Sequence, residues 1–149
     1  MMRKLIWMLL IGSLVAALSA CGSEPAGNPV QADDPVPADG AVLVEIVSLD
    51  HAPIRPAVQD VLAVAAEFGD KVTAQTYTFG TPEGDAFATA HDLTEHTPLA
   101  IFVNGEMEFE VDGRSVTFYS FPQGEGTGIV AEGVWTMADF RAVLAQETE

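Results

Sequence analysis

A short apolar run followed at once by a helical pattern constrains this chain more than any other feature. Residues 42–49 are apolar and rich in β-branched side chains, interrupted once by Glu45. A run this short with this composition predicts a strand buried on both faces rather than a helix. From Ile54 onward, apolar residues recur at helical spacing until Gly69 ends the pattern. The sequence therefore predicts a buried strand, a turn and a helix.

The turn between this strand and helix has the sequence Asp-His-Ala-Pro-Ile-Arg-Pro over residues 50–56. It resembles the active-site turn of the thioredoxin family, in which a Cys-x-Pro-Cys motif is followed by a basic residue. His51 and Ile54 take the places of the two cysteines, whereas Pro53 and Arg55 match the family pattern. The resemblance implies that the scaffold is kept while the thiols are lost.

Two acidic residues belong to the same comparison. Glu45 precedes His51 by six residues, the spacing of the acid that lies buried beneath the cysteine pair in the thioredoxin family. Glu45 is then either a structural acid satisfied by buried hydrogen bonds or a relic of proton transfer, and the absence of thiols favours the first. Asp50 immediately precedes His51 and is included with the turn.

The next segments predict a second strand and a second helix. Residues 71–79 are rich in β-formers and are expected to form a strand parallel to the first. Thr81 and Pro82 supply an N-cap and a proline at the first helical position, which predicts a helix as far as about Asp92.

A threonine–proline pair then enters an apolar strand at residues 99–103. His96, Thr97 and Pro98 resemble the cis-proline loop of the thioredoxin family. The resemblance implies a cis bond between Thr97 and Pro98, and it implies that this loop faces the turn that holds His51.

The C-terminal part predicts two hairpin turns and a final helix. Asn104-Gly105 and Asp112-Gly113 signal turns, with alternating strand 106–111 between them and a further strand over 116–121 that the minimal family pattern lacks. A glycine-rich loop spans 122–133. Thr136 and Asp139 predict a capped last helix, with Trp135 and Phe140 placed as a hydrophobic staple.

Together these elements predict one α/β domain over residues 41–149. The resemblance implies a thioredoxin-like three-layer fold, with a central mixed β-sheet flanked by helices and, as the departure from the family, an extra C-terminal β-hairpin. Phe118, Tyr119, Phe121 and Trp135 lie around that hairpin and its loop, either as a local core or as an aromatic contact surface for a partner.

The N-terminus predicts a bacterial lipoprotein. Residues 1–20 combine a positive start with an apolar run, as in a signal peptide, and Leu-Ser-Ala-Cys at 18–21 matches the lipobox. Cys21 is then diacylated and becomes the mature N-terminus; the other interpretation is an ordinary signal peptide with a chance cysteine. Residues 21–40 form a tether rich in proline and acids.

Cysteine count and charge exclude several functions. Cys21 is the only cysteine, so the mature domain has no thiol for disulfide exchange and none for iron–sulfur or thiolate metal sites. Loss of residues 1–20 leaves four basic and 22 acidic residues, a net charge of −18. Such a charge disfavours nucleic acid and anionic lipid headgroups as ligands of the domain. The acidic stripe Glu106, Glu108 and Glu110 is interpreted as a solvated strand face.

The histidines suggest the main alternative. His51 and His96, with Asp50 or Glu95, would form a histidine and carboxylate site for zinc, copper(II) or nickel if the turn and the loop meet. The other interpretation, which we favour, is that His51 simply replaces a lost cysteine with a polar residue. His91 is expected on the surface.

The sequence therefore predicts a lipid-anchored, extracytoplasmic protein of the bacterial cell envelope. Relatives in that location commonly act on disulfides of exported proteins or in cytochrome maturation, but the missing cysteines deny that activity here. We expect a binding or assembly module for an envelope or exported protein, with no cofactor and no catalysis. The alternatives are a metal-binding lipoprotein and, more remotely, an enzyme that uses His51 as acid or base.

Overall fold

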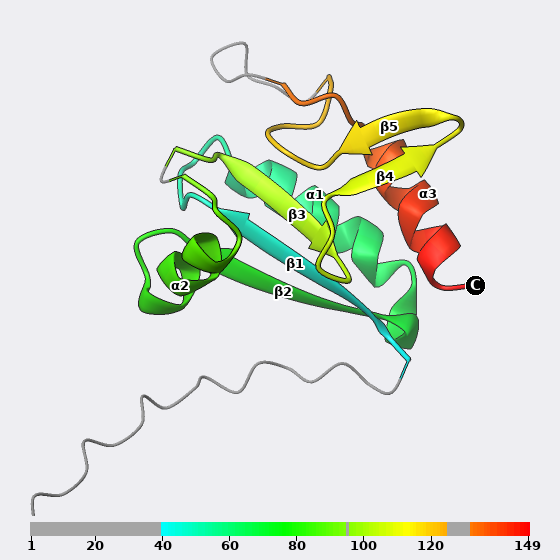
Figure 1. Ribbon diagram of the computed structural model, residues 1–149, viewed down its shortest axis with the longest axis horizontal. Coiled ribbons are helices and arrows are strands. Elements are labelled where there is room, and N and C mark those ends of the chain that lie inside the picture. The colour runs from blue at the N-terminus through cyan, green and yellow to red at the C-terminus, as the bar shows by residue number, and fades with distance from the viewer. Residues whose placement is uncertain (1–39, 95, 125–131) are drawn as a thin grey trace, which may run out of the picture. The chain divides into compact units, whose positions relative to one another are not determined.

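The computed structural model describes residues 40–94, 96–124 and 132–149. The elements, shown in Figure 1, are β1 (Val42–Ser48), α1 (Arg55–Ala66), a 3-10 turn η1 (Gly69–Lys71), β2 (Val72–Thr78), α2 (Pro82–Ala90), β3 (Leu99–Val103), β4 (Glu108–Val111), β5 (Arg114–Thr117) and α3 (Met137–Glu147). The predicted signal segment 1–20 and Cys21 lie outside the described residues. No helix among the residues described is long and apolar enough to cross a membrane.

The central sheet is mixed, as predicted. Its strand order is β2-β1-β3. β1 and β2 run parallel with Val42 opposite Val72, and β3 runs antiparallel to β1 with Val103 opposite Val44. The prediction of a parallel neighbour for the first strand is therefore confirmed.

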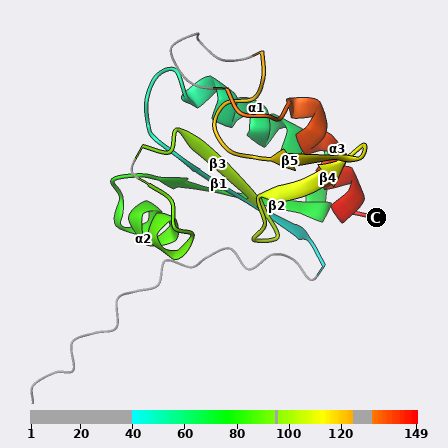
Figure 2. The same cartoon turned by 45° about the horizontal axis from the view of Figure 1, so that its top comes forward.

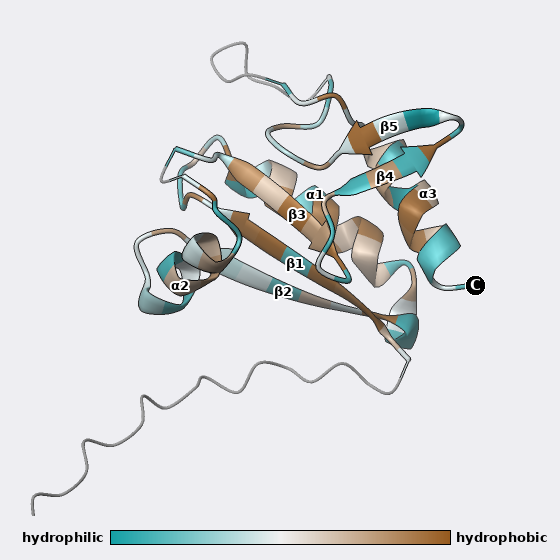
Figure 3. Ribbon diagram, in the orientation of Figure 1, coloured by the Kyte–Doolittle hydropathy of each residue, from teal (hydrophilic) through white to brown (hydrophobic). Residues whose placement is uncertain are grey.

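Helices cover both faces of this sheet. Successive side chains of a strand point to opposite faces, and Val44 and Ile46 of β1 pack in one core with residues of α1 and α3, whereas Val47 packs in a second core beside α2. Figure 2 shows α1 and α3 on one side of the sheet and α2 on the other. In Figure 3, β1 and β3 are largely brown, while β2 is pale.

The hairpin after β3 differs from the expected arrangement. Strand 106–111 was expected to return alongside 99–103, but only Glu106 pairs with β3, opposite Val103. The chain then leaves the sheet as the β4–β5 hairpin, and residues 118–120 return to the edge of β3. The backbone N–H of Ile101 donates to the carbonyl of Phe118 at 3.0 Å. The hairpin leaves the sheet because its residues Val111 and Val116 pack into the core formed with α3.

The predicted helix caps of α2 and α3 are confirmed. The Thr81 hydroxyl accepts from the N–H of Gly84 at 3.1 Å, and Thr136 and Asp139 form a complete capping box at the start of α3. Trp135 is fully buried and packs edge-on against Phe118, with ring centroids 5.4 Å apart. Phe140 and Phe118 pack in the same way at 5.5 Å, so the predicted core under the hairpin exists.

Candidate functional site

The turn between β1 and α1 projects its first half into solvent and its end into the core. His51 and Pro53 are exposed, whereas Ile54 is only 4% exposed and packs beneath α1. The N–H of Ile54 donates to the carbonyl of His51 at 2.9 Å, which closes the turn. Ile54, the side chain that the sequence resemblance aligns with the second cysteine, is therefore a core residue.

An ion pair spans the same turn. The Nε of Arg55 donates to a carboxylate oxygen of Asp50 at 2.8 Å, and both side chains are more than half exposed. Exposed pairs of this kind contribute at most about 1 kcal/mol. Asp50 is thus directed toward Arg55.

The loop before β3 is tied to two other segments and is braced by one contact within itself. The N–H of Leu49 donates to the carbonyl of Pro98 at 3.4 Å, which ties the end of β1 to this loop. The side chain of Thr97 is fully buried, and its hydroxyl lies 3.3 Å from that of Tyr119 and 3.5 Å from that of Thr94. His96, in contrast, is exposed.

The structure brings the turn and the loop together around one pocket of about 420 Å³, a size suited to small ligands or side chains. Both elements and the segment after β5 contribute to its lining, which consists of Leu49, His51, Pro53, Ile54, His96, Pro98, Tyr119 and Ser120. The walls are mostly apolar, and the two histidines supply polar edges. No thiol is present, because the sequence has no cysteine after Cys21.

Tyr119 is the aromatic residue that reaches this pocket. Phe118, Phe121 and Trp135 are fully buried, whereas Tyr119 is 38% exposed. Neighbouring residues of an extended chain point to opposite sides, which separates Tyr119 from Phe118. Ser120 has φ +66°, and this bend interrupts the alternation before Phe121. Tyr119 also lines an adjoining pocket of about 400 Å³ together with Val134, which is 59% exposed. Sequence reasoning grouped these aromatics and did not single out Tyr119.

Glu45 lies elsewhere. It is half-buried on β1 and accepts a hydrogen bond from the Tyr77 hydroxyl at 3.3 Å. Alternation puts its side chain on the sheet face shared with Val47, opposite the face against which Ile54 packs. Glu45 is not among the residues that line the pocket with His51. Spacing from His51 alone did not reveal which face Glu45 occupies.

The histidines lie in two different environments. His51 and His96 line the same pocket, but the described residues contain no group of three histidine, cysteine or acidic side chains placed to hold a metal ion. Glu95, a candidate third ligand, lies outside those residues. His91 was expected on the surface and is instead half-buried, with its ring stacked on Phe87 at 4.3 Å and against Phe102 at 4.3 Å.

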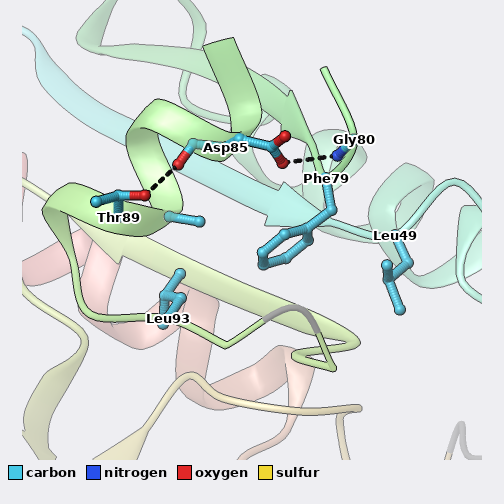
Figure 4. Close-up of a pocket in the computed structure, with 7 residues that line it drawn as sticks. Leu49, Phe79, Gly80, Asp85, Thr89 and Leu93 are labelled. Carbon is cyan, nitrogen blue, oxygen red and sulfur yellow. Dashed lines mark hydrogen bonds between the residues drawn. The ribbon is translucent and has the colours of Figure 1, made fainter. Parts of the chain in front are cut away.

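A second pocket of about 450 Å³ lies between α2 and the ends of β1 and β2 (Figure 4). Leu49, Phe79 and Leu93 supply apolar walls. Asp85 is directed toward Gly80, whose N–H donates to its carboxylate at 2.8 Å. Leu49 also lines the pocket of the turn and the loop, so this one side chain contributes to both.

Comparisons with protein-family models, curated proteins and solved structures find no match to this chain. The function of the site must therefore be inferred from its own residues.

Proposed function

We propose that this chain is a lipid-anchored, thioredoxin-like protein of the bacterial cell envelope that binds a protein partner and carries no redox or other catalytic activity. The order β1-α1-β2-α2-β3 supports the fold proposal, together with the parallel pairing of β1 with β2 and the antiparallel pairing of β1 with β3. The extra β4–β5 hairpin is then an insertion before the final helix.

One observation carries the binding function, namely the mostly apolar pocket between the turn and the loop. Pro53 and Pro98 border it from two elements, and Tyr119 adds an exposed aromatic wall. Partly exposed aromatic rings beside concave apolar surface are typical of protein contact sites. An apolar side chain of an extended partner segment fits a pocket of this size and lining.

The residues at the cysteine positions support the absence of thiol chemistry. Exchange needs one thiolate that attacks and another that resolves the mixed disulfide. His51 is an imidazole and Ile54 is a buried hydrocarbon side chain, so neither can form a disulfide. The domain keeps the surface around such a turn and uses it for binding alone.

The charge of the chain limits which kinds of partner can bind. A formal charge of −16, or −18 after removal of residues 1–20, repels polyanions. We therefore propose a neutral or basic protein segment as the occupant. Anchoring places that segment in an envelope or exported protein, and mass spectrometry of the native protein tests this part directly. A diacylated Cys21 at the N-terminus is expected, and an unmodified Cys21 contradicts the anchor.

The binding proposal is tested by site-specific photocrosslinking in envelope membranes. A benzophenone-bearing phenylalanine replaces Tyr119 in one variant and Ser115 in the control. Both positions are exposed, but Ser115 lies on β5 outside the pocket. A discrete protein adduct at position 119 that is absent at 115 supports the proposal. Equal adducts at both positions, or none at 119, contradict it.

A metal site is the second candidate, and one observation favours it. His51 and His96 line the same pocket although 45 positions separate them in the sequence. Two imidazoles bind divalent transition metals when their nitrogens reach one ion at about 2.0–2.1 Å each. Asp50 is directed to Arg55, so a third ligand must come from another residue. The titration that separates the two candidates is described in the Discussion.

A further inference from the structure

β2 forms one edge of the central sheet. Among the described residues only β1 pairs with it. The N–H of Phe79 donates to the carbonyl of Ser48 at 3.1 Å, and in a parallel pair the backbone groups of alternate residues point to the same side. The odd-numbered residues of β2 therefore bond to β1. The backbone N–H and C=O groups of Ala74 and Thr76 point away from β1, toward the open edge.

This edge carries few of the features that usually prevent strand pairing. Exposed edges are commonly protected by lysine, proline, a bulge or a very short strand. β2 is seven residues long, its register with β1 is continuous from Val72 to Thr78, and its sequence Val-Thr-Ala-Gln-Thr-Tyr-Thr contains neither charge nor proline. An uncharged strand of this length is notable in a chain with 22 acidic residues.

The surface beside the edge carries no net charge. A pocket of about 230 Å³ lies between α1 and β2, and its lining includes Val58, Leu62, Thr76 and Thr78. The two charged residues of this lining, Asp50 and Arg55, form an ion pair with each other. Val58 and Leu62 are each half-buried, so α1 leaves apolar side chains beside the open backbone groups. The edge of β2 and this flank of α1 form one continuous surface.

We propose that this surface binds a second copy of the chain, with the two β2 strands antiparallel about a two-fold axis. Centring the pair on Gln75 places Ala74 opposite Thr76 of the partner subunit. Since both residues direct their backbone groups outward, each pair exchanges two hydrogen bonds, as in an antiparallel ladder. The two three-stranded sheets then form one continuous sheet.

The residues that this register pairs argue for a second copy as the occupant, because none of them is charged. Two strongly acidic molecules repel each other wherever charged surfaces meet, but this register opposes only uncharged residues. Val72 lies opposite Thr78 and Thr73 lies opposite Tyr77 across the axis, and pairs of threonine with an aromatic residue are favourable across strands. A two-fold axis normal to the sheet also keeps both α1 helices on one face of the joined sheet. The surfaces around Leu62 in the two copies then lie next to each other.

A cysteine crosslink tests the register. Gln75 lies on the axis in a non-hydrogen-bonded pair, where Cα atoms approach about 4.5 Å, within the range for a disulfide. The full chain with Cys21→Ser and Gln75→Cys is oxidised with copper phenanthroline, and the control carries Ser115→Cys on exposed β5 in place of the change at Gln75. A covalent dimer is expected for Gln75→Cys alone. No dimer, or equal dimer in the control, overturns the proposal.

A second variant keeps the test independent of that cysteine. The N–H of Ala74 points away from β1, so Ala74→Pro preserves the pairing within the sheet while blocking the edge. Analytical ultracentrifugation of the full Cys21→Ser chain is expected to show a dimer whose dissociation constant rises about tenfold or more in Ala74→Pro, because each loss occurs twice about the axis. Circular dichroism should show the same folded spectrum for both chains.

A monomeric parent, or a folded Ala74→Pro variant that dimerises as tightly as the parent, contradicts the inference. Neither result bears on the pocket of the turn and loop, because β2 contributes no residue to its lining. The photocrosslinking test at position 119 and the dimer test can therefore fail independently of each other.

Discussion

The hydroxyl oxygens of Tyr119 and Thr97 lie 3.3 Å apart and join the segment after β5 to the loop before β3. The backbone of Tyr119 also forms a bridge with Ala100 in β3. Tyr119 is thus fixed at both its backbone and its hydroxyl, while its ring remains partly exposed. The aromatic wall of the pocket is therefore held in place by contacts within the chain.

Tyr119→Phe tests this bond without removing the ring. Thr97 is fully buried, and among the described residues the loss of the tyrosine hydroxyl leaves its own hydroxyl only the 3.5 Å contact with Thr94. We expect the free energy of unfolding in urea to fall by about 0.5–1.5 kcal/mol. Ser115→Ala, a hydroxyl deletion at an exposed position of β5, serves as control and should change it little. Equal stability of Tyr119→Phe and the parent would show that the bond contributes nothing.

Asp139 links the β4–β5 hairpin to α3, and it gives a prediction about pH. Burial raises the pKa of Asp139, but hydrogen bonds from Arg114 and Thr136 outweigh that effect and hold the pKa below its ordinary value. A lowered carboxyl pKa stabilises the folded state above the unfolded pKa of about 3.9, and the stabilisation disappears as pH falls through the folded pKa.

Asp139→Asn should therefore cost about 1–2 kcal/mol at neutral pH through loss of the charged cap. The difference in unfolding free energy between parent and variant should stay constant down to about pH 4 and shrink below it. Denaturant titrations over a pH series measure this. Asp60→Asn, at an exposed position of α1, is the matched control. A difference that does not change at acid pH would contradict the assigned role of the charge.

Local signals in the sequence predicted the parts of the fold that depend on neighbours along the chain. Thr81 with Pro82 began a helix, and Asn104 has φ +51° in the turn after β3, where Asn-Gly was read as a hairpin. Each signal depends on residues only a few positions apart, so it predicts local structure independently of how the rest of the chain packs. The parallel pairing of β1 with β2 was expected from the strand–helix–strand unit.

The parts that depend on distant packing could not be read in the same way. Residues 118–120 pair with β3 because the hairpin before them packs toward α3, and no local pattern states where a hairpin will pack. His91 follows Phe87 by four residues at the end of α2, so that stacking is local, whereas its contact with Phe102 depends on how α2 packs against β3. The turn and the loop supply five of the eight residues that line the pocket, and these five were named from the sequence. Tyr119 was not singled out, because its position depends on which strand edge its segment joins.

Metal binding separates the two proposed functions. Calorimetric titration of the chain with zinc and copper(II) should show weak binding that His51→Ala does not alter, because acidic surface residues are then the only ligands. His91→Ala removes a histidine that does not line the pocket and serves as control. Tight one-to-one binding that is lost in His51→Ala and kept in His91→Ala would replace the partner-binding proposal with a metal site.

We propose that residues 51–54 keep the geometry of a dithiol turn from which the thiols are gone. The hydrogen bond from the N–H of Ile54 to the carbonyl of His51 closes a turn in which the two Cα atoms lie within about 7 Å, a distance that overlaps the range for disulfides. Restoring both cysteines should therefore create a disulfide, while the parent has no thiol there to react.

The decisive measurement is thiol titration of the His51→Cys, Ile54→Cys double variant in the Cys21→Ser chain after mild oxidation, with each single variant as control. We predict no free thiol in the double variant, recovery of two on reduction, and one free thiol in each monomeric single variant. The parent should reduce insulin no faster than a blank without protein. Two free thiols in a folded, oxidised double variant would contradict the assignment of this turn and the thioredoxin-like account built on it.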